Sequence, residues 1–254
     1  MTKRIMGFET EYAILLLGCG SALRPAESAC RELIALARAS LVHLPGVGAK
    51  DLFLANGCRL YIDAGSHPEW CTAECDNPTD CVRYYLAGDA VLGDLVSELL
   101  SQARSSARAM LYKCNVDYAQ PGVTWGLHES YLVRVDPSSL SPALMPMLVS
   151  RIIFCSGGID PFCPGVRFSL SPRLHMFSSK SRECTMQGGV VAPGRGIFNP
   201  RDEALCRGYR RLHVICADSV SSHVALWLRV GSTALVVAMA EAGLKPEGEI
   251  ELQD

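Results

Sequence analysis

The feature that most constrains this chain is the alternation of polar and apolar residues in short segments. Glu9 and Glu11 stand two residues apart inside an apolar run that covers residues 5–17. Arg59, Tyr61 and Asp63 alternate in the same way with two aliphatic residues. Successive side chains of a β-strand point to opposite faces. Both segments therefore predict strands of a sheet that has one face on a core and one polar face.

A third segment, residues 125–131, carries a weaker form of the same pattern. His128 and Ser130 fall on one face of the expected strand, and Glu129 falls on the other. A single histidine of this kind is often a hydrogen-bonded core residue, so a structural role and a role in a site both stay open for His128.

The remaining pattern predicts an α+β domain. Apolar periodicity and capping residues indicate helices over residues 25–42, 77–99, 141–154 and 222–242. Strands are expected over residues 52–54, 109–116, 125–135 and 212–217, in addition to residues 5–17 and 59–64. Residues 65–72 are predicted to form a polar turn. Residues 157–165 and 187–200, rich in glycine and proline, give no assignment.

The charge balance narrows the class of partner. The chain has 254 residues, of which 26 are acidic and 24 are basic, so no basic field indicates nucleic acid or an anionic membrane as the main partner. Residues 224–242 are apolar enough to imitate a membrane span. Because Arg229 interrupts this run and Glu241 closes it, a core helix is the favoured interpretation.

Twelve cysteines raise the question of compartment and metal binding. The first residues contain no signal-peptide hydrophobic stretch, which predicts a cytoplasmic protein with free thiols. Cys71, Cys75 and Cys81 are close in sequence, but no second cysteine pair accompanies them. Small buried side chains are therefore favoured over a zinc site.

The polar strand faces can support metal and phosphate chemistry. Two carboxylates on one face, such as Glu9 and Glu11, repel each other unless a cation lies between them, and oxygen ligands favour Mg²⁺ or Mn²⁺. A solvated strand face is the alternative for this pair alone. The second strand adds Asp63, and the turn after it adds Glu69 and Thr72. No glycine-rich phosphate loop occurs, so a nucleotide would have to be held by metal and side chains.

Five short sequence motifs resemble those of a known family. They are RIMGFETEY at residues 4–12, NGCRLYIDAGSHPE at 56–69, TAECD at 72–76, GLHESYL at 126–132 and YRRLHVI at 209–215. The motifs are similar, in the same order, to those of the Pup-protein ligases and their sister Pup deamidases, which are related to glutamine synthetase. The resemblance implies a glutamine-synthetase-like fold with a curved, mostly antiparallel sheet and helices on its outer face.

The resemblance also implies residue roles. It assigns Mg²⁺ to Glu9, Tyr61 and Glu69, ATP contacts to Arg59 and Thr72, and the catalytic carboxylate to Asp63. Glu11, His128, Arg173 and Arg210 are additional candidates for the site. Arg201 is a further candidate, and these arginines could also have a purely structural role. In the family's ligases, ATP phosphorylates the terminal glutamate side chain of Pup, and a lysine of a protein substrate then attacks it. A carboxylate base is needed because a lysine amine is protonated at neutral pH.

Several departures keep alternatives open. The family is about twice as long, so residues 1–254 are expected to be the amino-terminal part of the catalytic domain, without the family's small carboxy-terminal domain. Pro172 stands where the family has glutamine, and the sequence motifs after residue 199 differ from those of the family. A ligase is favoured by the short stretch 44–54 and by the wording of residues 65–69. A Pup deamidase and a diverged protein that only binds the tag remain the alternatives.

Overall fold

The fold is built on one eight-stranded sheet in a computed structural model that describes residues 3–17, 25–45, 48–63, 65–102, 108–113, 115–154, 157–181, 186–187, 190–191, 195–201, 208–244 and 246–248. The strand order is β10-β13-β14-β7-β1-β5-β4-β3, and every pairing except that of β10 with β13 is antiparallel. The strands of this sheet are β1 (Met6–Glu11), β3 (Asp51–Phe53), β4 (Arg59–Asp63), β5 (His67–Cys71), β7 (Leu127–Val133), β10 (Phe177–Ser181), β13 (Arg195–Arg201) and β14 (Arg210–Val214).

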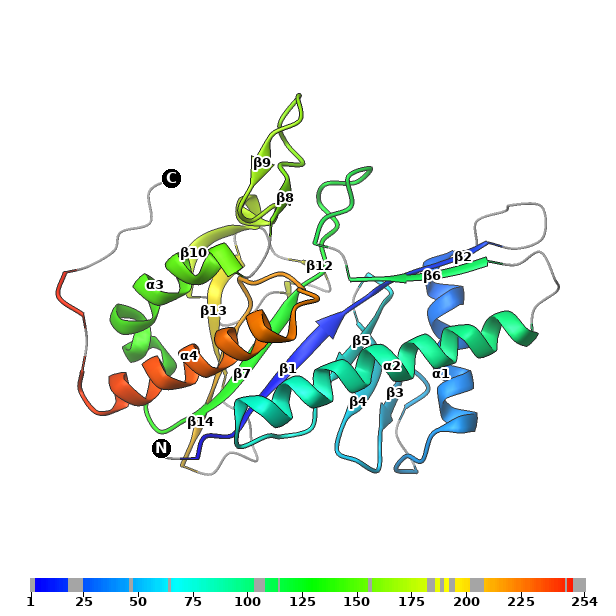
Figure 1. Cartoon of the computed structure of the whole chain (residues 1–254), viewed down its shortest axis with the longest axis horizontal. Coiled ribbons are helices and arrows are strands. Elements are labelled where there is room, and N and C mark those ends of the chain that lie inside the picture. The colour runs from blue at the N-terminus through cyan, green and yellow to red at the C-terminus, as the bar shows by residue number, and fades with distance from the viewer. Residues whose placement is uncertain are drawn as a thin grey trace.

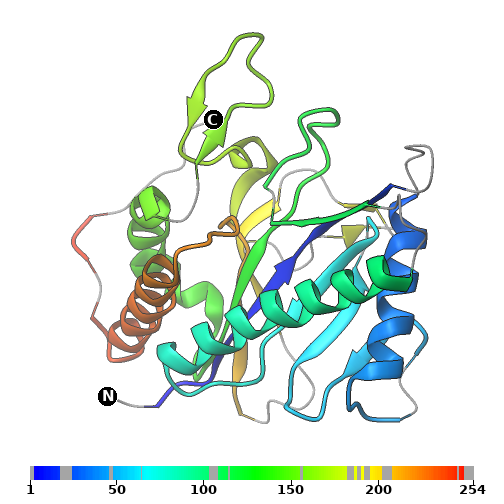
Figure 2. The same ribbon diagram turned by 45° about the vertical axis from the view of Figure 1, so that its right-hand side comes forward.

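Four α-helices cover one face of the sheet (Figure 1). They are α1 (Ala26–Ser40), α2 (Pro78–Gln102), α3 (Ser141–Ser150) and α4 (His223–Glu241), and three short 3₁₀ helices lie at η1 (Pro137–Leu140), η2 (Arg151–Phe154) and η3 (Leu174–Met176). Figure 2 shows α2 running across the strands, with α1 near one edge and α3 and α4 near the other. Asn77 caps α2 by accepting a hydrogen bond from the amide of Asp80 at 2.9 Å.

The apolar core lies between the helices and the sheet in two clusters. One cluster joins β1, β7 and β14 to α2, α3 and α4, and the other joins β4, β5 and a further strand, β2 (Ala13–Leu17), to α1 and α2. Phe8, Leu60 and Trp70 are among the buried side chains that the main sheet contributes. The polar residues that alternate with them are consequently left on the face that the helices do not cover.

Three two-stranded ribbons complete the fold: β2 (Ala13–Leu17) with β6 (Arg108–Tyr112), β8 (Gly158–Ile159) with β9 (Phe168–Ser169), and β11 (Met186–Gln187) with β12 (Val190–Val191). Figure 1 shows the β8–β9 hairpin projecting from the body of the protein. The expected strand over residues 5–17 is interrupted at Tyr12, where the chain leaves the main sheet and continues in β2.

The predicted fold class is confirmed, and one local prediction is wrong. Residues 65–72 are not a turn throughout, because residues 67–71 form β5, which pairs with both β1 and β4. The turn is confined to a short connection in which Gly65 and Ser66 have positive φ values of 89° and 62°. Polar composition suggested a loop here, but this strand carries polar residues because one of its faces belongs to the site.

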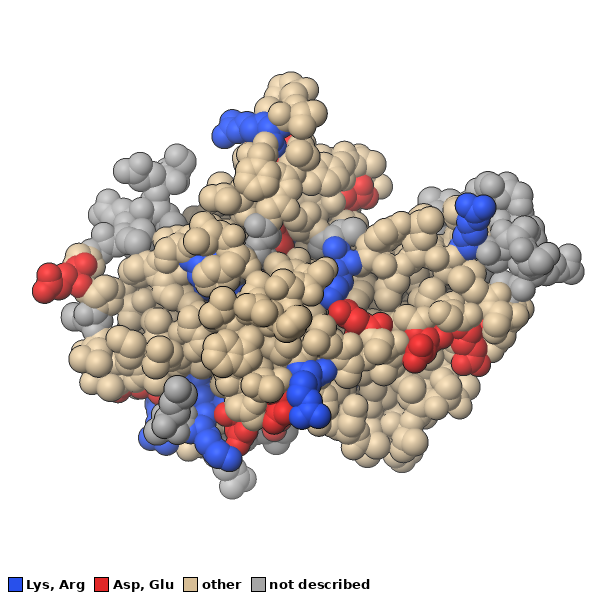
Figure 3. Space-filling model, viewed as in Figure 1, with Lys and Arg blue, Asp and Glu red and all other residues tan. Residues whose placement is uncertain are grey.

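Helix α4 occupies the segment that resembled a membrane span. By length and composition it is the one described helix that could cross a bilayer. Its inner face packs on the sheet and on α2 and α3, with Arg229 fully buried, which supports the interpretation as a core helix. Its outer face exposes Leu228, Leu235 and Met239, and the region around it is largely uncharged (Figure 3).

The described cysteines carry free thiols. They are Cys30, Cys58, Cys71, Cys75, Cys81, Cys163 and Cys216. Five of these are buried, and burial raises the pKa of the Cys58 thiol to about 11. Among the described residues, no cysteine belongs to a cluster that could hold a metal ion.

Candidate active site

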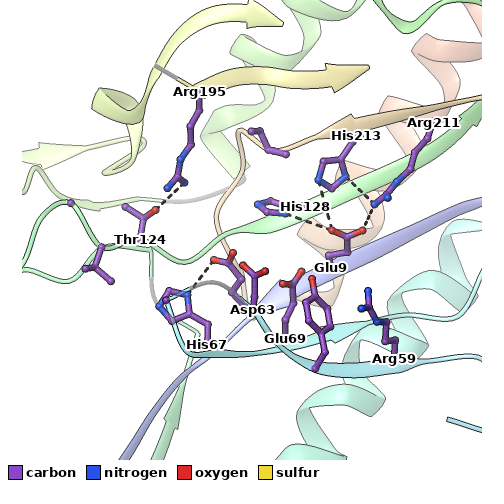
Figure 4. Close-up of a pocket in the computed structure, with 16 residues that line it drawn as sticks. Glu9, Arg59, Asp63, His67, Glu69, Thr124, His128, Arg195, Arg211 and His213 are labelled. Atoms are coloured by element: carbon purple, nitrogen blue, oxygen red, sulfur yellow. Dashed lines mark hydrogen bonds and ion pairs between the residues drawn. The ribbon is translucent and has the colours of Figure 1, made fainter. Parts of the chain in front are cut away.

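A cavity of about 360 Å³ opens on the sheet face that the helices leave uncovered. Figure 4 shows carboxylates at its floor and arginine and histidine side chains around them. Its lining contains Glu9, Glu11, Arg59, Tyr61, Asp63, His67, Glu69, Thr124, His128, Arg195, Arg211 and His213, together with Gly65, Gly122, Val123 and Ile215. The two segments on which the sequence interpretation depended, around Glu9 and Asp63, therefore meet in one hollow.

Strand register explains why these residues meet. Glu11 of β1 lies opposite Glu69 of β5, which in turn lies opposite Tyr61 of β4. Asp63 lies opposite His67 at the end of the same hairpin. Since directly opposed residues point to the same face, three strands deliver these side chains to one floor.

Three carboxylates form an acidic cluster. One oxygen each of Glu11, Asp63 and Glu69 lies within 4.8 Å of the others. Burial, followed by repulsion from Glu11 and Glu9, raises the pKa of Glu69 well above its usual value. Glu69 Oε1 is buried and has no hydrogen-bond partner within the described part of the chain. This all-oxygen set, with one oxygen unsatisfied, fits a hard divalent cation such as Mg²⁺.

Glu9 stands in a different environment. Its carboxylate pairs with Arg211, and Nδ1 of His128 and Nε2 of His213 each lie 3.8 Å from its Oε2. Burial opposes ionisation of Glu9, but His213, His128 and Arg211 together hold the pKa of this carboxyl well below its usual range. Glu9, His128 and His213 also form a second group of side chains that could hold a cation.

Arg59 and Tyr61 form one end of the cavity. The Arg59 guanidinium lies 4.1 Å from the centroid of the Tyr61 ring, and its Nε donates to Asp51 at 2.9 Å. Burial and then the neighbouring Glu69 raise the pKa of the Tyr61 phenol far above its usual value. Tyr61 is thus a protonated phenol beside the acidic cluster, and Arg59 is a fixed cation.

Comparison with known proteins identifies the family. A family model described as Pup-ligase protein matches residues 4–254. The chain belongs to this family. The Pup–protein ligase of Corynebacterium glutamicum strain R is 37% identical over 254 aligned residues, which cover 95% of this chain and 50% of the relative. The Pup–protein ligase of Gordonia bronchialis is 38% identical, with 96% and 53% covered.

Two solved structures resemble the fold of this Pup-ligase family member. A complex of the prokaryotic ubiquitin-like protein Pup with its ligase PafA gives a TM-score of 0.76 at 32% identity, covering 95% of this chain and 48% of that chain. The Pup ligase PafA with ADP gives 0.63 at 31% identity, covering 89% and 49%. The chain spans about half the length of the curated relatives it matches.

Some residues that the family resemblance suggested lie outside the cavity lining. Thr72 uses its hydroxyl to accept a hydrogen bond from the Phe8 amide at 3.0 Å. Arg173 is buried and donates to the Ala217 carbonyl at 2.9 Å. Arg210 is exposed, and the side chain of Arg201 lies outside the described residues. The roles proposed for these residues remain predictions.

Several cavity residues were not singled out from the sequence. Arg211 lines the cavity in place of its neighbour Arg210, because Arg211 and His213 alternate on one face of β14. The alternation of side-chain direction along the motif YRRLHVI, residues 209–215, could have identified this pair. Arg195 and Thr124 come from segments without a regular pattern, so no sequence signal pointed to them.

A buried ionic network lies directly behind the cavity. Glu129, on the face of β7 opposite His128, accepts two hydrogen bonds from Arg151 at 2.7 and 2.8 Å and one from Arg229 at 2.6 Å. Arg229 also donates to the Leu127 carbonyl at 2.6 Å. Helix α4 is thereby tied to the backbone on the N-terminal side of His128, which fixes that part of the cavity wall.

Proposed function

We propose that this protein takes part in the ATP- and Mg²⁺-dependent formation of an isopeptide bond between the terminal glutamate side chain of Pup, or a Pup-like tag, and lysines of protein substrates. The observation that carries the proposal is the acidic cluster of Glu11, Asp63 and Glu69 inside one cavity bordered by arginines. Membership of the Pup-ligase family supports the same reaction, and the relatives reported above are named ligases, which favours ligation over deamidation.

The cavity residues supply the roles that such a reaction needs. Glu9, Tyr61 and Glu69, with Glu11 beside them, would hold Mg²⁺, which when bound neutralises phosphate charge and orients the phosphoryl group. Arg59 and Arg211 would hold ATP phosphates, with Thr72 as a further predicted contact. Transfer of the γ-phosphoryl group of ATP to the tag's glutamate carboxylate would release ADP and give a glutamyl phosphate, an acyl phosphate whose carbonyl carbon an amine can attack.

Asp63 would act as the base for the attacking lysine. A lysine side chain is almost fully protonated at neutral pH, so a carboxylate close to the reacting carbon must remove a proton before the amine attacks. Asp63 is the cluster member at the end of its hairpin, beside the turn formed by Gly65 and Ser66. The attacking amine would donate its proton to this carboxylate and expel phosphate.

We further propose that residues 1–254 form the amino-terminal part of a glutamine-synthetase-like catalytic domain and that the protein works in the cytoplasm. A match that covers nearly all of this chain and about half of each relative supports a partial catalytic domain, and its placement at the amino-terminal end comes from the family resemblance of the sequence motifs. The cytoplasmic location is supported by the free thiols of the described cysteines.

The decisive experiment replaces Asp63 by asparagine. Asp63→Asn removes the base at nearly constant volume, so we expect ligation of Pup to a lysine-bearing protein to fall by about 10²- to 10⁴-fold, with Mg²⁺-dependent ATP binding retained. Asp94→Asn, on the exposed face of α2, is the matched control and should change neither quantity. Equal ligation rates for Asp63→Asn and the unmodified chain would refute the assignment.

Two outcomes would select the alternatives. Release of ammonia from a Pup that ends in glutamine, without ligation, would identify a deamidase. Binding of Pup without any binding of ATP would identify a protein that only recognises the tag.

A further inference from the structure

One arginine of the cavity lacks an acidic partner. Arg195, the first residue of β13, lines the cavity and makes no ion pair with an acidic residue anywhere in the described ranges. In contrast, Arg59 pairs with Asp51 and Arg211 pairs with Glu9. The hydrogen bond that Arg195 makes goes to a neutral group, since its Nη1 donates to Thr124 Oγ1 at 3.1 Å.

This arrangement is unfavourable for the unliganded protein. A partly buried charge loses hydration, and a neutral hydroxyl replaces only part of what a carboxylate would return. Burial and then repulsion from Arg173 lower the pKa of the Arg195 guanidinium to about 10, although Glu11 and Asp63 act in the opposite direction. An anion that enters the cavity would therefore be stabilised at this position.

The hydrogen-bonding capacity around Arg195 is suited to two oxygen atoms. Because Thr124 accepts from Arg195, the hydroxyl hydrogen of Thr124 is left to donate elsewhere, and no described residue accepts it. The remaining N–H groups of the Arg195 guanidinium can donate as well. A planar guanidinium beside a hydroxyl donor is an arrangement that binds carboxylate or phosphoryl oxygens.

The position of Arg195 distinguishes the two ends of the cavity. Figure 4 shows Arg195 and Thr124 on the side of His67 and Asp63, whereas Arg59 and Arg211 lie on the other side of the acidic floor. Arg59 and Arg211 are the cations assigned above to ATP phosphates. The group that reacts next to Asp63 should consequently be held by Arg195.

We propose that Arg195 and Thr124 form the subsite for the side-chain carboxylate of the glutamate that becomes joined to lysine. This inference rests on the proposed function and adds a specificity-determining residue to it. The subsite would favour a Pup tag that ends in glutamate over one that ends in glutamine. The reason is that the amide nitrogen of glutamine cannot accept a hydrogen bond from the Arg195 guanidinium or the Thr124 hydroxyl.

The experiment measures dissociation constants of the full 254-residue chain for two probes, Pup that ends in glutamate and Pup that ends in glutamine, with Mg²⁺–ADP as a separate ligand. We expect Arg195→Met to weaken binding of the glutamate form by about 10- to 100-fold, the effect of losing a charge-assisted hydrogen-bonded pair. Binding of the glutamine form should change little, so the preference between the two forms should largely disappear. Arg195→Lys keeps the positive charge but loses the planar set of guanidinium N–H donors, so it should retain part of the preference.

Thr124→Val should reduce the same preference to a smaller extent. Arg167→Met removes a positive charge from the exposed end of the β8–β9 hairpin and should leave every constant unchanged. Thermal unfolding of each variant checks that the fold is retained. The preference ratio is the deciding readout, since a purely structural role of Arg195 would weaken both forms of Pup equally.

Three results would overturn the assignment. An unchanged preference in Arg195→Met, with normal Mg²⁺–ADP binding, refutes the carboxylate subsite and leaves the proposed function intact. Loss of Mg²⁺–ADP binding alone makes Arg195 a phosphate contact instead. Failure of the unmodified chain to bind both Pup and Mg²⁺–ADP refutes the proposed function, and the subsite with it.

Discussion

Replacing Glu129 by glutamine should remove a large part of the stability of this fold. The Glu129 carboxylate is completely buried and holds two arginines, Arg151 and Arg229, whose side chains are 2% and 0% exposed. Glutamine has nearly the same size but no charge, so Glu129→Gln leaves two buried guanidinium groups without their counter-ion. Removing one partner of a buried ion pair costs about 3–5 kcal/mol.

The pKa of Glu129 gives a second route to the size of this effect. Burial disfavours the charged carboxylate, but Arg151 and Arg229 prevail and lower the pKa of Glu129 from 4.5 to about 2. Because one pKa unit corresponds to about 1.4 kcal/mol, the ionised form contributes about 3 kcal/mol. A depressed carboxyl pKa stabilises the fold above the unfolded-state value, so this contribution is complete above pH 4.5 and is lost as the pH falls towards 2.

The assay is thermal and urea unfolding of the 254-residue chain at pH 7 and at a series of lower pH values. For a chain of this length, about 3 kcal/mol corresponds to a fall in Tm of roughly 6–12 °C. Glu129→Gln should also lose the part of the acid sensitivity that the wild type shows below pH 4.5. Glu27→Gln, which breaks the exposed pair with Arg31 on α1, is the matched control and should show no measurable change. A Tm for Glu129→Gln equal to that of the control would refute the reasoning.

Two further predictions concern helix α2 and the acidic cluster. Gly88→Ala should lower the free energy of unfolding by about 1–3 kcal/mol, because a Cβ at this position would lie 2.5 Å from the Trp70 ring. Gly93→Ala on the same helix has open space around it and should instead raise stability by up to about 1 kcal/mol; equal effects of the two substitutions would contradict the packing argument. Since the pKa of Glu69 is raised, Mn²⁺ should bind with release of a proton and more tightly as the pH increases, as measured by titration calorimetry in buffers of different ionisation enthalpy. Glu69→Gln should weaken Mn²⁺ binding and remove the proton release, and proton release that persists in this variant would exclude Glu69 as its source.

Much of the candidate site followed from local alternation. Because polar and apolar residues alternate along each strand, Glu9 and Glu11 were expected on one polar face, and Arg59, Tyr61 and Asp63 on another. The structure brings all five residues into one cavity. These predictions succeed because side-chain direction along a strand depends only on neighbouring residues. Glu69 was also placed near the site, although the turn assigned to it is a strand.

Other parts of the site depended on contacts that local pattern does not encode. Arg195 enters the cavity because β13 pairs with β14, which pairs with β7, and residues 187–200 carry no periodic signal. The polar residues His67 and Glu69 concealed β5, and they are polar because they face the cavity. Local rules are expected to fail at functional sites, where side chains are chosen for chemistry rather than for burial.

The sequence alone indicated the positions of the four α-helices, the polar and apolar faces of β1 and β4, and the family resemblance. Only the tertiary structure decided that β1 lies between β5 and β7, that Arg211 rather than Arg210 faces the cavity, and that Arg229 of an apolar helix neutralises Glu129. The physical reason is the range of the forces involved. Alternation and capping act between residues close in the chain, whereas strand order and buried ion pairs join residues far apart, and their energies exist only once the sheet has formed.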